Sequence, residues 1–241
     1  MSDPELIWLR PERGARGPAP AHTRAEIAAV AVALADAEGL AGVSMRKVAA
    51  ALGTGAMSLY NYVPGKEQLY DLMVDAVAAE MEPAVRPPGD PRADLAEFAR
   101  QGIALLRRHP WLPPLVSSRL TIGPNSLRQL EYFLGIMSGV DAPAVTKMEL
   151  YALLNGFLYT FAQFEANQRD TAVQMQADIT RYLTEAAATG NYPNLVAAFT
   201  NPGSPPDPGT DAMFERTLPR VIDMILGPSN LWGTGALLVG G

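Results

Sequence analysis

The chain has 241 residues, of which 48% are hydrophobic and 18% charged. This composition excludes wholesale disorder and allows a sizeable core in one or two domains. The chain contains no cysteine, which excludes disulfides and thiolate metal sites and favours a reducing cytoplasm. Acidic residues follow Met1 where a signal peptide would be basic. The most apolar stretches, 28–35 and 153–162, are far shorter than the ~20 residues that span a bilayer. We therefore expect a cytoplasmic protein with no membrane contact.

The net charge of −6 does not by itself indicate a nucleic-acid partner. The charge is unevenly distributed along the chain. Residues 1–66 hold seven basic and six acidic residues, whereas residues 67–241 hold twelve and nineteen. The N-terminal part is relatively basic without being a basic tail, so the charge does not identify a partner and the residue pattern has to do so.

The N-terminal third reads as an arm followed by short helices. Residues 1–22 are rich in proline and glycine with arginines between them, which is typical of a flexible arm. Thr23 and Glu26 have the spacing of a capping box, and Gly39 is a suitable C-terminal cap, so a first helix is predicted between them. Further helices are predicted from Ser44 to Leu52, from about Ala56 to Tyr62, and from Lys66 onward.

A proline-rich stretch, Pro83 to Pro91, is the predicted boundary between two domains. After it the pattern is again helical, with segments near 92–108, 111–120, 125–138, 143–168, 170–188 and 208–226. No run of alternating β-branched residues is found. The predicted fold class is all-α, with nine or ten helices. The predicted organisation is a flexible arm (1–22), a first domain of short helices (23–82), a second helical domain (83–228) and a tail (229–241).

The segment from Ser44 to Lys66 has the pattern of a helix-turn-helix, because two short helices flank the glycine turn at residues 53–55. Such a unit places its second helix in the major groove of DNA. Ala56, Leu59 and Val63 are suited to pack inward. Met57, Ser58, Asn61 and Tyr62 project elsewhere and carry groups that suit base edges. Lys66, at the start of the next helix, is suited to reach a phosphate.

The run from Thr23 to about Val77 resembles the DNA-binding domain of TetR/AcrR regulators. The resemblance is carried by Gly39, by residues 44–49, by Leu52-Gly53, by residues 58–63, and by Lys66 and Leu69. It implies a transcriptional regulator, usually a repressor, that binds a palindromic double-stranded operator. From the pattern and the resemblance together, the predicted DNA-binding residues are Arg46, Thr54, Gly55, Ala56, Met57, Ser58, Tyr60, Asn61, Tyr62 and Lys66.

The C-terminal part resembles the effector domain of the tetracycline-repressor type, on the run from Arg108 to Leu112. The resemblance implies that this domain encloses a small-molecule effector, with apolar walls and a few polar anchors. The predicted ligand-binding residues are His109, Trp111, Leu115, Arg119, Tyr132, Asn155, Tyr159 and Gln163. A structural role at a helix junction fits His109 equally well. The aromatic residues of the helix near 143–168 lie on more than one face of it, so we expect some of them in the core or the dimer interface and others in the wall of the pocket.

The expected assembly is a homodimer, because one recognition helix covers only a few base pairs and a symmetric dimer reads a palindrome. We expect the interface to use the helix around 143–167 and the helix around 210–226. In the latter, apolar residues repeat at helical spacing: Met213, Phe214, Leu218, Val221, Ile222 and Ile225. The alternative is that this stripe packs within one chain.

Two other classes of protein, an enzyme and a helical adaptor, fit the sequence less well than the regulator. An enzyme is disfavoured because His22 and His109 are the only possible histidine bases, and His22 lies in the arm. No Gly-x-Ser-x-Gly, P-loop or dinucleotide-binding motif is found. A helical adaptor would leave the glycine turn and the exposed face around Asn61 and Tyr62 without a purpose. We therefore expect no catalytic residue, no metal and no cofactor.

Overall fold

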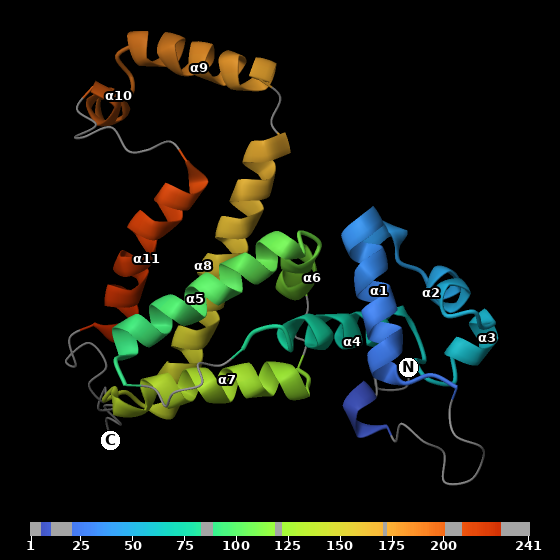
Figure 1. Ribbon diagram of the computed structural model, residues 1–241. Helices are drawn as coiled ribbons and strands as arrows, with labels where there is room; N and C mark the ends of the chain where they lie inside the picture. Colours follow the sequence, from blue (N-terminus) through green and yellow to red (C-terminus); the bar gives the residue numbers. More distant parts are fainter. Residues whose placement is uncertain are drawn as a thin grey trace, which may run out of the picture.

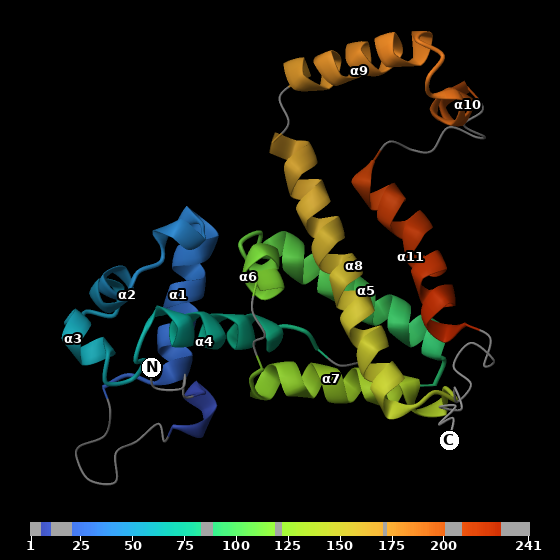
Figure 2. The same cartoon turned by 180° about the vertical axis from the view of Figure 1, so that it is seen from behind.

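The computed structural model describes residues 6–10, 21–82, 89–118, 122–170, 173–200 and 209–227. Within these ranges the secondary structure is helical and contains no strand, which confirms the predicted all-α fold class. None of the described helices is long and apolar enough to cross a membrane. The chain forms an N-terminal bundle of short helices and a larger group of long helices, and α4 (Lys66–Ala78) reaches from the first into the second (Figures 1 and 2).

The N-terminal bundle consists of α1 (Arg24–Glu38), α2 (Met45–Ala51), α3 (Ala56–Leu59) and the first part of α4. The capping box at the start of α1 is present with both of its hydrogen bonds, between Thr23 and Glu26. The helix ends at Gly39, whose φ of 72° is a left-handed value that favours glycine. Helix α1 packs along α4 and against α2. The buried side chains between them include Ile27, Ala31, Val48, Leu59, Leu69 and Met73.

The larger group contains α5 (Pro91–Arg108), α6 (Leu112–Ser118), α7 (Pro124–Ile136), α8 (Ala144–Asp170) and α11 (Thr210–Leu226). Helix α5 packs against α7, α8 and α11. A bidentate ion pair strengthens this packing, because Arg107 of α5 donates to Glu165 of α8 at 2.6 and 2.8 Å. Glu165 is buried, and the Arg107 guanidinium also lies over the ring of Phe214 in α11. Three helices are thus joined at one point.

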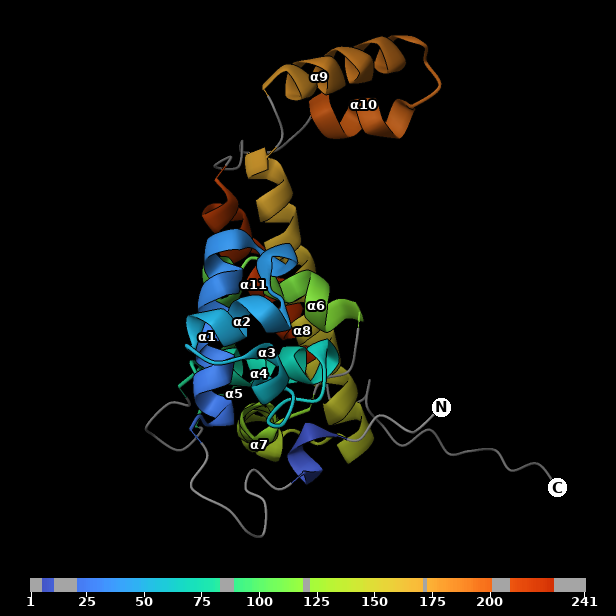
Figure 3. The same ribbon diagram turned by 90° about the vertical axis from the view of Figure 1, so that its right-hand side faces the viewer.

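Helices α9 (Val173–Ala188) and α10 (Pro193–Thr200) pack against each other and project beyond the ends of α8 and α11 (Figure 3). Met175, Ile179 and Tyr182 of α9 are exposed apolar side chains. The sequence pattern did not predict α10. Its first residue is Pro193. A proline in the sequence indicates the interruption of a helix, but it also fits the first position of a helix, where its missing N–H needs no partner.

Residues 6–10 lie within the predicted flexible arm, yet they are folded onto the molecule. Residues Ile7–Leu9 form a short 3-10 helix, η1, and Ile7 is fully buried. Arg24 Nη1 donates to the carbonyl oxygens of Ile7 and Arg10, each at 2.9 Å. A buried side chain and two charge-assisted hydrogen bonds therefore hold this part of the arm. The rest of residues 1–20 and the predicted tail at 229–241 lie outside the described residues.

A buried carboxylate of α4 caps the start of α7. Asp75 is 3% exposed, and its Oδ1 accepts the backbone N–H groups of Asn125 (2.9 Å) and Ser126 (3.0 Å). Its Oδ2 accepts Nδ2 of Asn125 at 2.9 Å. An acidic group at a helix N-terminus satisfies backbone donors and interacts favourably with the helix dipole. Because the cap comes from another helix, it also fixes α7 against α4.

We predict that Asp75→Ala lowers the free energy of unfolding by about 1–3 kcal/mol, because it leaves buried donors of α7 without an acceptor. Urea denaturation should show a lower midpoint with an unchanged slope. Asp178→Ala is the matched control, since Asp178 pairs with Arg181 on the surface of α9, and it should change stability by less than about 0.5 kcal/mol. Equal midpoints for the two variants would show that the cap contributes nothing.

Candidate recognition helix and ligand cavity

The geometry of the helix-turn-helix is set by hydrogen bonds at the ends of α2. The Ser44 side chain caps the start of α2 by accepting the N–H of Lys47 at 3.2 Å. The turn that follows contains Gly53 at a φ of 69°, a left-handed value that disfavours other residues. The N–H of Thr54 donates to the carbonyl of Ala49 at 2.9 Å. These contacts fix the direction in which α3 leaves α2.

Helix α3 has one buried side and one exposed side. Leu59 and Val63 are fully buried against the N-terminal bundle, whereas Met57 is 80% exposed and Tyr60 45% exposed. Asn61 is also exposed. Helices α2 and α3 lie at the outer edge of the N-terminal bundle, away from the long helices (Figure 1). The arrangement leaves the predicted base-reading face open for a duplex. The helix itself is shorter than predicted, because residues 60–62 are turns.

The other predicted DNA-binding residues surround this face. Arg46 and Gly55 are exposed, and Thr54, Ala56 and Ser58 are partly exposed. Lys66 begins α4, with Nζ 5.3 Å from the centre of the Tyr70 ring.

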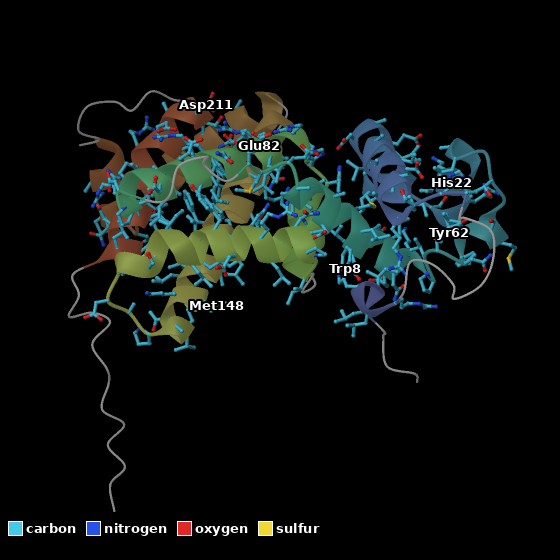
Figure 4. The ribbon with its side chains drawn as sticks, turned by 60° about the horizontal axis from the view of Figure 1, so that its bottom comes forward. Trp8, His22, Tyr62, Glu82, Met148 and Asp211 are labelled. Carbon is cyan, nitrogen blue, oxygen red and sulfur yellow. The ribbon has the colours of Figure 1, made fainter. Side chains whose placement is uncertain are left out.

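Tyr62 differs from these residues because it already has partners within the chain. Its hydroxyl accepts the N–H of Ala21 at 3.2 Å, and its ring meets the edge of His22 (Figure 4). Tyr62 therefore holds the chain that enters α1. A contact of Tyr62 with DNA remains a prediction, as it does for the other nine residues.

A cavity of about 590 Å³ lies among α4, α5, α6, α7 and α8. Its walls are mostly apolar, and they are supplied by side chains from all five helices and the segments beside them. The apolar lining residues include Val74, Met81, Leu105, Leu106, Leu112, Val116, Ile122, Leu127, Leu130, Met148 and Leu158. The volume lies within the range of ligand pockets in proteins.

A few polar groups interrupt the apolar walls. Tyr151, Asn155 and Tyr159 line the cavity from α8, and Gln129 lines it from α7. Burial raises the pKa of both tyrosine phenols, that of Tyr159 to about 12, so these hydroxyls stay protonated at neutral pH. Asn155 Nδ2 donates to the Tyr151 carbonyl at 2.9 Å, and Gln129 Nε2 donates to the Ala78 carbonyl at 2.6 Å. These bonds orient both amides.

The cavity brings together only part of the predicted ligand-binding set. Asn155 and Tyr159 line it. Trp111, Leu115 and Tyr132 are not among its lining residues, and Gln163 borders a separate small depression. Arg119 lies outside the described residues. Tyr151 is a lining residue that the prediction omitted, although its i, i+4, i+8 spacing with Asn155 and Tyr159 placed all three on one helix face. Gln129 had no such signal, because its position depends on how α7 packs.

His109 has a structural position at the junction of the two helical groups. Its Nδ1 lies 2.7 Å from Asp36 Oδ1 of α1, and its Nε2 lies 3.1 Å from Glu80 Oε1. Trp111 Nε1 donates to the same Asp36 oxygen at 2.7 Å, and Arg108 donates to Glu80 at 2.6 Å. His109 is 3% exposed. The corner between α5 and α6 is thereby bonded to α1, so His109 and Trp111 join the two groups of helices and leave the cavity wall to other residues.

An exposed second helix of a helix-turn-helix, in a bundle joined to a larger helical domain, defines the class of helix-turn-helix transcriptional regulators. The sequence profile of the bacterial regulatory proteins of the tetR family matches residues 27–73. The profile of the tetracyclin repressor-like C-terminal domain matches residues 83–226. The chain belongs to the TetR family, and it is accordingly a transcriptional regulator and not an enzyme.

Two named relatives extend this comparison. The chain is 37% identical over 201 residues to the HTH-type transcriptional repressor DrrR1 of Streptomyces coeruleorubidus, covering 80% of this chain and 74% of that protein. Its fold is similar to that of apo ActR from Streptomyces coelicolor, with a TM-score of 0.74 and 28% identity over 89% of this chain and 99% of ActR. The complex of ActR with actinorhodin matches with a TM-score of 0.73 and 28% identity, over 87% and 98%.

Proposed function

We propose that this protein is a cytoplasmic repressor that binds a palindromic operator as a homodimer and releases it when a small molecule occupies the cavity. The observation that carries the proposal is that α4 takes part in both sites. Lys66, a predicted phosphate contact, begins α4, and Val74 and Ala78 line the cavity near its end. The similarity to a repressor, DrrR1, and to an actinorhodin-bound regulator, ActR, supports the two halves of the proposal.

In the proposed complex α3 enters the major groove and α2 lies across the DNA backbone. The exposed side chains of Met57 and Asn61 face base edges, where an asparagine pairs with adenine and a methionine contacts a thymine methyl. Gly55 presents no side chain, and apart from its chain neighbours no atom of the described residues lies within 4 Å of where its Cβ would be. A phosphate backbone can therefore approach the start of α3 closely. Residues 23–82 act as the DNA-binding domain and 83–228 as the effector-binding and dimerisation domain.

The lining of the cavity indicates the chemistry of the effector. The lining residues in the described part of the chain carry no acidic or basic side chain, so a formal charge on the ligand would lose its hydration without gaining a partner there. The neutral phenols of Tyr151 and Tyr159 and the oriented amides of Asn155 and Gln129 suit hydroxyl and carbonyl groups. The effector is therefore a mainly apolar ring system that carries hydroxyl or carbonyl groups.

Occupation of the cavity moves α4 and with it the recognition helix. The two recognition helices of a dimer have to lie about one helical turn of DNA apart, about 34–36 Å, and a shift of a few ångströms weakens the fit. The effector acts only if it binds the released form more tightly than the DNA-bound form. Coupling free energies of about 1–3 kcal/mol are typical of such linked sites.

The dimer interface is proposed to use exposed faces of α8 and α11, but not the stripe that the sequence indicated on α11. Phe214, Leu218, Ile222 and Ile225 are buried within the single chain, against the other long helices. For these four residues the interface prediction is wrong, because α11 uses them to complete its own domain, whereas Met213 and Val221 are half-buried. On α8, Leu153, Gly156, Thr160 and Phe164 are exposed and repeat at helical spacing. This face leaves room for close helix packing at Gly156.

We predict that Lys66→Ala weakens binding to all operator sequences about equally, because it removes a phosphate contact. The slope of the logarithm of the binding constant against the logarithm of the salt concentration should fall in magnitude by roughly 1. Asn61→Ala should cost about 1–3 kcal/mol only at particular base pairs, because it removes a base contact. Fluorescence anisotropy with a selected operator measures both effects, and Arg181→Ala on α9 is the control. If Tyr60→Ala and Lys66→Ala both bind as tightly as the parent protein, the proposed docking is wrong.

We predict that actinorhodin or (S)-DNPA, the molecules bound in the ActR complexes, bind in the cavity and dissociate the operator complex. Asn155→Leu and Tyr159→Phe should each weaken ligand binding by roughly 3- to 10-fold, the effect of losing one hydrogen bond of about 0.5–1.5 kcal/mol. Gln163→Leu is the control on the same helix and should bind as the parent does. Calorimetry provides the affinities. Equal affinities for all three variants would place the ligand outside this cavity.

We predict a dimer at micromolar concentration that Leu153→Arg converts to a monomer, because the change introduces an unpaired charge into the α8 face. Light scattering after gel filtration gives the mass of each species. Leu9→Arg, at a 75% exposed position of η1, should remain dimeric. A monomeric parent protein, on and off DNA, would refute the proposed assembly.

A further inference from the structure

The N-terminal segment of residues 6–10, here called the strap, is held on the DNA-binding domain by the buried side chain of Ile7 and by hydrogen bonds from Arg24. Arg24 lies at the start of α1, and its Nη1 donates to the carbonyls of Ile7 and Arg10. The Nε of the same guanidinium donates to the carbonyl of Tyr62 at 3.4 Å. Tyr62 is the last residue of the turn that follows α3. Arg24 therefore connects the strap to the turn at the C-terminal end of the recognition helix.

The strap also contacts the effector-binding domain, through Trp8. A Cβ atom on Gly123 would lie 2.7 Å from Cζ2 of Trp8 and would overlap the Asp75 carboxylate. Gly123 has a φ of −130°, which any residue adopts, so the glycine is required by lack of space and not by its backbone conformation. Trp8, the middle residue of η1, lies beside the start of α7 (Figure 4). The indole thus packs against the residue that precedes α7.

Helix α7 is in turn a wall of the cavity. Ser126, Leu127, Gln129 and Leu130 line it, and so does Ile122, the neighbour of Gly123. A continuous series of contacts therefore leads from the cavity wall through Gly123 and Trp8 to the strap, and from the strap through Arg24 to Tyr62. None of these steps passes along the backbone of α4.

We propose that the strap is a second connection between the effector cavity and the recognition helix, parallel to α4, with Trp8 and Arg24 as its positioning residues. This inference rests on the proposed function, since it concerns how the cavity and the DNA-binding face are coupled. With Trp8 packed against Gly123, the strap and Arg24 hold the end of α3 in place. A shift of α7 that opens the space at Gly123 releases Trp8, and the end of α3 loosens. Coupling of this kind needs an element with two discrete arrangements, and a packed or released strap is such an element.

Hydrogen exchange of the full chain, followed by mass spectrometry, tests this connection without requiring an effector. In the free protein, Trp8→Ala should speed the exchange of amides at residues 61–63 and 122–127 by roughly tenfold, which corresponds to about 1.4 kcal/mol. Leu9→Ala is the matched control, because Leu9 is in the strap but 75% exposed. In this variant the amides at residues 61–63 and 122–127 should exchange as fast as in the parent. Arg24→Lys keeps the charge but loses the forked geometry, and it should speed exchange at 61–63 alone.

A second measurement uses a selected operator fragment at saturation. In the parent protein and in Leu9→Ala, operator binding should slow exchange at residues 122–127, and in Trp8→Ala this protection should fall at least about threefold. Equal protection in Trp8→Ala would show that coupling passes through α4 alone and would overturn the inference. Unchanged exchange at 61–63 in free Trp8→Ala would overturn it as well. Failure of the parent to bind any operator would refute the proposed function, while the free-protein comparison would still decide whether the strap holds the recognition helix.

Discussion

The buried carboxylate of Asp75 is the contact on which the relation between the two domains depends. Asp75 is 3% exposed, and a buried carboxylate is stable only if its oxygens accept hydrogen bonds. Two adjacent residues, Asn125 and Ser126, donate these bonds from their backbone N–H groups and their side chains. Helix α7 is therefore fixed at its first turn by α4. Helix α4 also begins beside the recognition helix. The same helix therefore contacts both α7, which forms a wall of the cavity, and the predicted DNA-binding face.

The junction has a second set of contacts on the other side of α4. In Figure 1, α6 lies above α4 and α7 lies below it. On the α6 side, His109 and Trp111 both bond to Asp36 of α1, and His109 and Arg108 bond to Glu80 just after α4. These are polar contacts to charged groups, which are strong only while their geometry is kept. Movement of one domain against the other has to change at least one of the two sets.

The fold was largely predictable from sequence because its signals are local. The capping box at Thr23, the glycine turn at Gly53 and the periodic apolar residues each depend on neighbours within a few positions. The cavity was only partly predictable, since Asn155 and Tyr159 share a helix face, whereas Gln129 reaches the cavity through the packing of α7 on α4. His109 was ambiguous for the same reason. Its partners, Asp36 and Glu80, are 73 and 29 residues away in the chain, and no local pattern indicates them.

The close approach at Gly123 has a consequence for building hybrid regulators. A DNA-binding domain moved onto a different effector domain by a cut in the middle of α4 would separate Trp8 and Arg24 from the glycine that the indole packs against. If the cut lies before Asp75, the residue at position 75 comes from the other protein and is joined to this recognition helix. If the cut lies after Asp75, this carboxylate meets an α7 that comes from the other protein. The unit that can be exchanged is therefore larger than the helix-turn-helix. It includes residues 6–10, the whole of α4 and the first turn of α7, and hybrids that respect these limits should keep the response of the parent proteins.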